Sequence, residues 1–174
     1  MKTSPASVVA TIRIAVLAAA LLGIAGAGSA TESEDCLEAP NFNVATIDNA
    51  RVSLAELKGQ KPLYLKFWLS SCPQCIAEMP HFVHSYEQYG DGIEIVAVNL
   101  AMDETMQTLE QALADHGLEM PVVFDESREM QTIFEVYGTP THVVIDKHGR
   151  IVHVSNAADE ALDAALDCVS RRTD

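Results

Sequence analysis

The chain has 174 residues, with 25 Asp and Glu against 11 Lys and Arg, a formal charge of −14 and four cysteines. This length allows one domain. The acidity excludes nucleic acid as an expected partner, because a surface that binds phosphate needs the Lys and Arg that are scarce here. With 48% hydrophobic and 21% charged residues, the composition is that of a globular chain with a buried core, not of a disordered one.

The first thirty residues have the pattern of a secretory signal. A basic start precedes an apolar run over residues 14–27, and the small residues Gly28 and Ala30 suit cleavage before Thr31. The run is shorter than the roughly 20 residues that a membrane-spanning helix needs. We therefore expect a signal peptide over residues 1–30, with a retained N-terminal anchor as the alternative.

Residues 31–174 are expected to form the single folded domain, and they contain all four cysteines. Export carries these cysteines into an oxidising compartment, where disulfides serve structure or catalysis. We therefore expect a periplasmic protein, which would face the periplasm from the inner membrane if the anchor is retained.

Local patterns predict strands and helices along the whole domain. Apolar alternation and aromatic or β-branched runs predict strands, and apolar residues at helical spacing predict helices. From the strand over 63–68 onward the order is β-α-β-α-β-α-β-β-α, an α/β fold with parallel crossovers first and a hairpin and closing helix last. In chain order we expect a strand over 42–47, a short helix opened by a capping box from Ser53 to Glu56, a strand over 63–68, a helix from 72 to 89 with a kink at Pro80, a strand over 93–99, a helix over 104–116, a strand over 122–124, a helix over 128–137, strands over 141–145 and 151–154, and a last helix over 159–169.

One motif in this series has a chemical meaning. Cys72 and Cys75 flank Pro73 and Gln74 at the point where a buried strand ends and a helix begins. Unpaired backbone N–H groups at a helix start stabilise a thiolate, and two intervening residues let the second sulfur reach the first. The placement predicts a redox-active pair, with Cys72 as the nucleophile and Cys75 as the resolving cysteine.

Structural zinc sites use the same cysteine spacing, but they need a second pair of ligands. The nearest candidates, His81 and His84, lie on the same helix as Cys75 and would be reached only if that helix folded back on itself. We therefore expect these histidines to face solvent, and we expect no metal and no cofactor.

Further motifs lie far from the cysteine pair, in an order and spacing that resemble the TlpA/ResA-type thioredoxin-like proteins. The resemblance covers nearly all of residues 31–174. It is carried by Ala39–Phe42, Val52–Leu54, Leu57–Gly59, Phe67–Trp68, Cys72–Cys75, Glu78–Pro80, Gly138–Thr141 and Ile145–Gly149.

This resemblance implies a thioredoxin-like three-layer sandwich, with a central mixed sheet, an N-terminal hairpin and a central β/α insertion. It implies an exported monomer that exchanges thiols and disulfides with other proteins. The expected partners are disulfide-containing exported proteins and an upstream electron donor, with membrane contact only through a retained N-terminal segment.

The resemblance also assigns residues around the cysteine pair. Pro140 matches the family's cis-proline, which faces the pair and docks substrate together with Thr139 and Trp68. Glu78 matches the family's active-site glutamate, and we expect a partly desolvated carboxylate with a raised pKa that accepts the proton of Cys75. The alternative is an acid favoured only by the helix dipole.

Two further expectations concern charge and cross-linking. Lys66 lies six residues before Cys72 and is expected to modulate the site by pairing with Glu78 and lowering its pKa, or else to reach solvent without a role. Cys36 and Cys168 are expected to form a structural disulfide, since some family members tie the lead-in segment to the last helix. Two free thiols, or exchange with the active site, are the alternatives.

Several departures from the family pattern keep other functions open. Ser71 stands where Trp is usual, and Thr141 stands where the cytochrome c maturation branch has Glu, so the substrate stays open. A Sco-like copper chaperone using His142 or His153 is one alternative, and a redox-silent interaction domain is another.

A peroxiredoxin is disfavoured, because Leu65 and Leu69 occupy its motif positions. The direction of electron flow is also open, since single residues near the cysteines can shift a dithiol potential enough to reverse it. The resemblance favours a reductant.

Overall fold

The structure is a computed structural model that describes residues 37–172. This part of the chain contains seven strands and six helices. It begins with a hairpin of two strands that have three residues each. The strands are β1 (Asn43–Ala45), β2 (Arg51–Ser53), β3 (Leu63–Trp68), β4 (Glu94–Asn99), β5 (Val122–Phe124), β6 (Thr141–Ile145) and β7 (Ile151–Ser155), and the helices are α1 (Leu54–Leu57), α2 (Pro73–Ala77), α3 (Met79–Tyr89), α4 (Met106–His116), α5 (Glu129–Ile133) and α6 (Glu160–Ser170).

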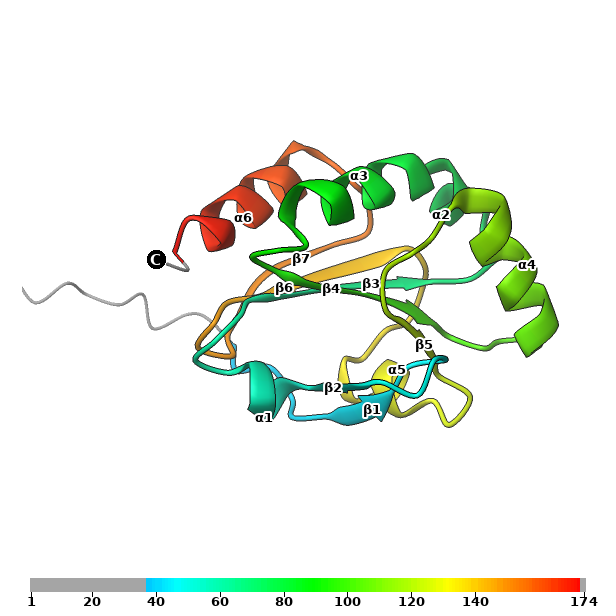
Figure 1. The fold of residues 1–174 in the computed structure, drawn as a ribbon, viewed down its shortest axis with the longest axis horizontal. Helices are drawn as coiled ribbons and strands as arrows, with labels where there is room; N and C mark the ends of the chain where they lie inside the picture. The colour runs from blue at the N-terminus through cyan, green and yellow to red at the C-terminus, as the bar shows by residue number, and fades with distance from the viewer. Residues whose placement is uncertain (1–36, 173–174) are drawn as a thin grey trace, which may run out of the picture. The chain divides into compact units, whose positions relative to one another are not determined.

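A five-stranded mixed sheet in the order β5-β4-β3-β6-β7 forms the middle layer. The strands β3, β4 and β5 are parallel, and β6 and β7 are antiparallel to their neighbours. The long helices α3, α4 and α6 pack on one face, and the hairpin, α1 and α5 pack on the other (Figure 1). This confirms the expected α/β sandwich with a central mixed sheet and an N-terminal hairpin.

The central strand β3 has the boundaries that its sequence predicts. All six of its residues are buried. Tyr64 and Trp68 face the core under α3 and α6, and Leu65 and Phe67 face the core under the hairpin and α5. Alternation along a strand places Lys66 on the same face as Tyr64 and Trp68, so a charged side chain enters the core below the helices.

The helix that follows the cysteine motif is divided in two, as the proline predicts. Helix α2 ends at Ala77, Glu78 has φ −91° and ψ −4°, and α3 begins at Met79. Pro80 lacks the N–H that would continue the first helix, and its ring would clash with the carbonyl of Ile76. The break turns the chain at Glu78, whose side chain is buried.

Three predicted helix starts or ends differ from the structure. The capping box at Ser53 is wrong: its side chain makes no capping hydrogen bond, because Ser53 is the last residue of β2. The helix expected from Glu104 begins at Met106, with Thr105 as its cap. The helix expected over 128–137 ends at Ile133, followed by Glu135 at φ 52°.

Within residues 37–172, no helix is long and apolar enough to cross a membrane. The predicted signal peptide and Cys36 lie outside the described residues.

Candidate active site

The cysteine pair lies at the carboxyl end of β3, at the start of α2. Cys72 and Cys75 form a disulfide with their Cα atoms 5.2 Å apart. Cys75 is fully buried and Cys72 is half-buried. The backbone N–H of Cys75 donates to Cys72 Sγ at 3.1 Å, so a donor is already in place for the negative charge that Cys72 carries as a thiolate.

A cis peptide bond joins Thr139 and Pro140, which confirms the expected cis-proline. The register of β3 with β6 places Phe67 opposite Thr141, so the loop before β6 reaches the end of β3. Cys72 Sγ lies 3.5 Å from the carbonyl oxygen of Thr139. The Asn156 side-chain amide donates to the Pro140 carbonyl at 3.0 Å and fixes the other side of the loop.

Trp68 does not belong to the exposed surface beside this loop. It is fully buried, since strand alternation points it under α2 and α3 together with Cys75. The expectation that Trp68 docks substrate is therefore wrong for this conformation, and its contribution is to the packing beneath the cysteines.

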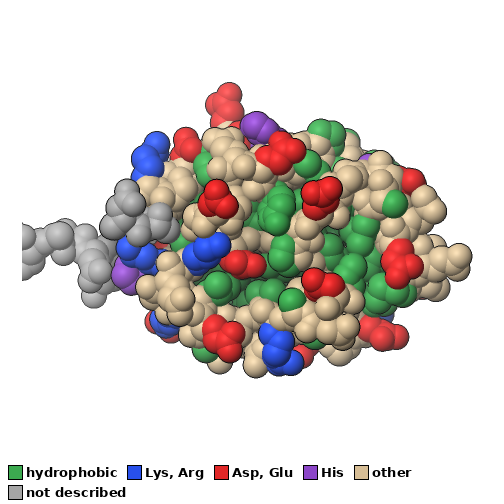
Figure 2. Space-filling view, in the orientation of Figure 1, with side chains coloured by type: hydrophobic (Ala, Val, Ile, Leu, Met, Phe, Trp, Pro, Cys, Tyr) green, Lys and Arg blue, Asp and Glu red, His purple; other side chains and the backbone are tan. Residues whose placement is uncertain are grey.

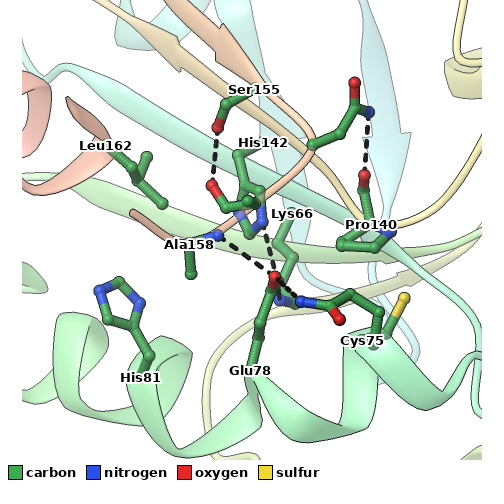
Figure 3. A network of polar contacts seen from close by, with 12 residues as sticks. Lys66, Cys75, Glu78, His81, Pro140, His142, Ser155, Ala158 and Leu162 are labelled. Carbon is green, nitrogen blue, oxygen red and sulfur yellow. Dashed lines mark hydrogen bonds and ion pairs between the residues drawn. The ribbon is translucent and has the colours of Figure 1, made fainter. Parts of the chain in front are cut away.

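The carboxylate of Glu78 is the centre of a buried polar network (Figure 3). Oε2 accepts from Lys66 Nζ and from His142 Nε2, both at 3.0 Å. Oε1 accepts from Gln74 Nε2 at 2.8 Å and from the backbone N–H of Ala158 at 3.2 Å. Four donors thus satisfy the carboxylate, and they join α2, β3, β6 and the loop before α6.

These donors correct the expectation for the pKa of Glu78. Burial alone would raise it, but the hydrogen bonds from Gln74 and Lys66 and the positive charge of Lys66 outweigh burial and lower the pKa to about 2. The expected raised pKa is wrong. A carboxylate this acidic, with its lone pairs occupied, is a poor acceptor for the proton of Cys75.

Of the two alternatives predicted for Lys66, pairing with Glu78 and not exposure to solvent is the one that the structure shows. Its side chain is fully buried and its ammonium pairs with Glu78. Burial lowers the pKa of Lys66, and the hydrogen bond and charge of Glu78 oppose that shift. The ammonium also lies 5.5 Å from the centre of the Phe82 ring, over which a cation is attracted.

The sequence gives no direct sign of His142 and Tyr64 as members of this network, nor of the donors Gln74 and Ala158. His142 stands opposite Lys66 in the register of β6 with β3, and its Nδ1 lies 2.7 Å from the hydroxyl of Tyr64. Because a carboxylate only accepts, the Nε2 of His142 carries the proton toward Glu78, and Nδ1 accepts from the Tyr64 hydroxyl. Only the position of Tyr64 on the face of Lys66 hinted at this contact.

The ring of His142 is therefore held neutral. Burial and then the charge of Lys66 lower its pKa to about 4, against the opposing effect of Glu78. Both ring nitrogens have partners, so His142 has no free nitrogen for copper. No group of His, Cys, Asp or Glu side chains over residues 37–172 is arranged to hold a metal ion.

The two histidines considered as zinc ligands, His81 and His84, do not contact the cysteine pair. Contrary to the prediction, His81 does not simply face solvent, because its Nε2 lies 2.8 Å from the Asp163 carboxylate of α6. This contact links α3 to α6, and His84 is exposed.

A second carboxylate holds the loop that precedes Cys72. Glu104 Oε1 accepts from the backbone N–H of Ser70 at 2.5 Å and of Ser71 at 3.3 Å. Its Oε2 accepts from the Asn99 amide at 2.8 Å, and Asn99 in turn accepts from the N–H of Ala101. The sequence pattern predicts a helix that includes Glu104 and gives no sign of this contact between two loops.

Replacing Glu104 with Gln is expected to destabilise the protein by about 1 to 2 kcal/mol, because the new amide would face the amide of Asn99, a donor against a donor. Chemical denaturation of the oxidised protein measures this loss. The matched control is Glu110→Gln on the exposed side of α4, which should stay within about 0.5 kcal/mol of the parent. Equal effects of the two changes would contradict the role of Glu104 in the loop.

The expected structural disulfide is only half within the described residues. Cys168 is partly exposed on α6, between the buried residues Leu166 and Val169. Cys36 lies outside the described part of the chain, so the pairing of Cys36 with Cys168 stays a prediction.

Comparison with known proteins agrees with this site. Residues 37–154 match the AhpC/TSA family. The thiol-disulfide oxidoreductase ResA of Halalkalibacterium halodurans is 35% identical over 135 residues, which cover 76% of this chain and 75% of ResA.

Solved structures show the same fold. A protein from Neisseria meningitidis assigned as a thioredoxin has a TM-score of 0.70 at 28% identity, covering 80% of this chain and 94% of its own. A Chlorobium tepidum protein assigned as the thiol:disulfide interchange protein DsbE has a TM-score of 0.69 at 27% identity, covering 78% and 96%. With the cysteine pair and the cis-proline at the end of β3, the chain belongs to the AhpC/TSA family, as a thioredoxin-like thiol-disulfide oxidoreductase of the ResA type.

Proposed function

We propose that this protein is exported and reduces disulfides of partner proteins through Cys72 and Cys75. The thiolate of Cys72 attacks one substrate sulfur, a mixed disulfide forms, and the other substrate sulfur leaves as a thiolate that takes a proton from water. Cys75 loses its proton to solvent and its thiolate attacks Cys72 Sγ; the internal disulfide forms, and the second substrate sulfur leaves as a thiolate that takes a proton from water. An upstream dithiol donor returns the two electrons to the pair.

The difference in exposure between the two sulfurs is the observation that carries these roles. Cys72 is half-buried beside the Thr139 carbonyl, whereas Cys75 is fully buried. A substrate disulfide can therefore approach Cys72 and not Cys75. The backbone N–H of Cys75 stabilises the attacking thiolate, and the loop with the cis Thr139–Pro140 bond lies beside it, where the substrate chain would dock.

The buried network supports the chemistry without exchanging a proton with Cys75. The Gln74 side chain lies within the cysteine motif and donates to Glu78, so the ionised carboxylate fixes the orientation of α2. Lys66 places a positive charge beneath the same helix and compensates the carboxylate. Glu78, Lys66 and His142 are therefore positioning residues in this proposal.

The test is a comparison of single cysteine variants. Cys72→Ser should abolish insulin reduction, and Cys75→Ser should accumulate a mixed disulfide with its substrate, because the resolving sulfur is missing. Cys168→Ser should keep the activity of the parent. Full activity in Cys72→Ser, or faster alkylation of Cys75 than of Cys72 in the reduced protein, would overturn the roles.

The direction of electron flow has its own measurement. Equilibration with glutathione or dithiothreitol gives the reduction potential of the pair, and a reductant should lie near the potential of thioredoxin, about −270 mV. A potential near that of a strong oxidant, about −120 mV, would contradict the proposed direction while leaving the exchange chemistry in place.

A further inference from the structure

An apolar groove begins next to the nucleophile. It has a volume of about 500 Å³, and its wall contains Thr139, Pro140, Ile151 and Val154. Cys72 does not line the groove, but its Sγ lies 3.5 Å from the carbonyl oxygen of Thr139, which does. Tyr137, also in the wall, is 92% exposed, and Val154 is 59% exposed. Large apolar side chains exposed in a groove mark a surface that a partner covers.

The exposed charges at this end of the sheet are almost all negative. The parallel strands β3, β4 and β5 end at this edge of the sheet, β6 starts there and β7 ends there. The connecting loops and the start of α6 therefore surround Cys72. Their exposed acidic residues are Asp103, Glu126, Glu129, Glu135, Asp159 and Glu160, against the single basic residue Arg128.

The opposite end of the sheet carries charges of both signs, with Lys58, Lys61, Arg150 and Arg171 each paired to an acid. Six of the nine Lys and Arg of the described residues lie in loops or at the helix end there, namely Lys58, Lys61, Lys147, Arg150, Arg171 and Arg172. On the face shown in Figure 2, most Lys and Arg side chains lie in the half nearer the C-terminus, whereas acidic side chains lie over both halves. The end of the sheet at Cys72 is thus the more uniformly negative of the two.

We infer that the partner segment that occupies this groove is extended and cationic, with an apolar side chain close to its cysteine. This inference rests on the proposed function and specifies its substrate class. Tyr137 and Val154 supply the apolar contact, and Glu135 in the wall of the groove faces the positive charge. The surrounding carboxylates attract such a segment and repel an acidic one.

Small disulfides of matched size test the charge preference. The probes are cationic cystamine, neutral hydroxyethyl disulfide and anionic dithiodiglycolate, and each rate is divided by the rate with dithiothreitol to remove intrinsic reactivity. The corrected rate with cystamine should exceed that with dithiodiglycolate by about tenfold at low ionic strength. The ratio should approach one at about 0.5 M salt, where charges separated by several ångströms are screened.

Two double variants separate the surface from the net charge. Glu126→Lys with Glu135→Lys should remove or reverse the preference. Asp91→Lys with Glu119→Lys changes the total charge equally at the other end of the sheet and should retain the preference. An equal loss in both double variants would overturn the inference, because net charge alone would then explain it.

The apolar part has a separate readout. Of two lysine-containing peptide disulfides that carry either Leu or Gly beside the cysteine, the Leu peptide should react faster, and Tyr137→Ser should reduce that difference. Reduction of the neutral disulfide without charge or Leu preference would overturn the inference and leave the proposed function standing. Failure to reduce any of the disulfides would overturn the proposed function itself.

Discussion

Replacing Lys66 with Met is expected to lower the free energy of unfolding by about 3 to 5 kcal/mol, the loss typical of removing one partner of a buried ion pair. The change deletes the ammonium 3.0 Å from Glu78 and leaves a carboxylate with only 8% of its side chain exposed. Gln74, His142 and Ala158 still donate to it, but they carry no compensating charge. Denaturation by urea at pH 7 measures the loss.

Two controls show whether the charge is responsible. Lys66→Met combined with Glu78→Leu removes both charges and should recover much of the loss, because the isolated buried carboxylate is gone. Lys61→Met breaks an exposed pair with Glu94 at 3.9 Å and should cost at most about 1 kcal/mol. If Lys66→Met destabilises no more than Lys61→Met, the buried pair has no special role in stability.

The second large effect is a loss of stability in mild acid. His142 has a folded-state pKa of about 4, below its ordinary value of 6.5. Between these values the unfolded chain binds a proton that the folded protein rejects, so stability is complete above about pH 6.5 and falls as the pH drops to 4. The shift corresponds to on the order of 3 kcal/mol.

Glu78 adds a second, lower window. Its folded-state pKa of about 2 lies below the ordinary 4.5, so its contribution is complete above about pH 4.5 and is lost as the pH falls through 2. The two residues thus act in succession as acid is added, His142 first and Glu78 second.

Melting temperatures between pH 4 and pH 7.5 test the contribution of His142. His142→Gln keeps an amide that can donate to Glu78 but does not titrate, so its curve should be flatter than that of the parent above pH 4. His148→Gln changes an exposed histidine and should follow the parent. An unchanged slope in His142→Gln would assign the acid sensitivity to other groups.

The parts of the fold and site that could be predicted are those whose signals are local. The buried run from Leu63 to Trp68 and the two cysteines after it identify the strand, the helix start and the redox pair within thirteen residues. Pro80 predicts the break before α3 because its missing N–H acts on its own helix. The cis-proline was predicted through resemblance, not through local physics.

The network around Glu78 could not be predicted, because its members come together only through strand pairing. Lys66 and His142 become neighbours through the register of β3 with β6, which no periodicity in either segment specifies. The pKa of Glu78 is lowered because its hydrogen-bond donors and the charge of Lys66 outweigh the effect of burial. Trp68 was misassigned for a related reason, since proximity in sequence to Cys72 does not decide which face of the sheet a strand residue occupies.

Local signals misplaced two side chains at helix starts. Glu104 stands near the start of α4, yet its carboxylate binds backbone groups of the loop before Cys72. Ser53 belongs to β2 and does not cap α1. A residue type suited to a helix start therefore does not by itself decide what its side chain binds.

The hydrogen bonds from that loop to Glu104 do not depend on the side chain at position 71. The contacts are made to main-chain N–H groups, which every residue except proline possesses, and the Ser71 side chain is exposed. A bulkier or charged residue there would alter the surface beside the nucleophile without disturbing the anchor that sets its geometry. A substitution at position 71 can therefore change which substrates fit beside Cys72 while the backbone around the cysteines keeps its geometry.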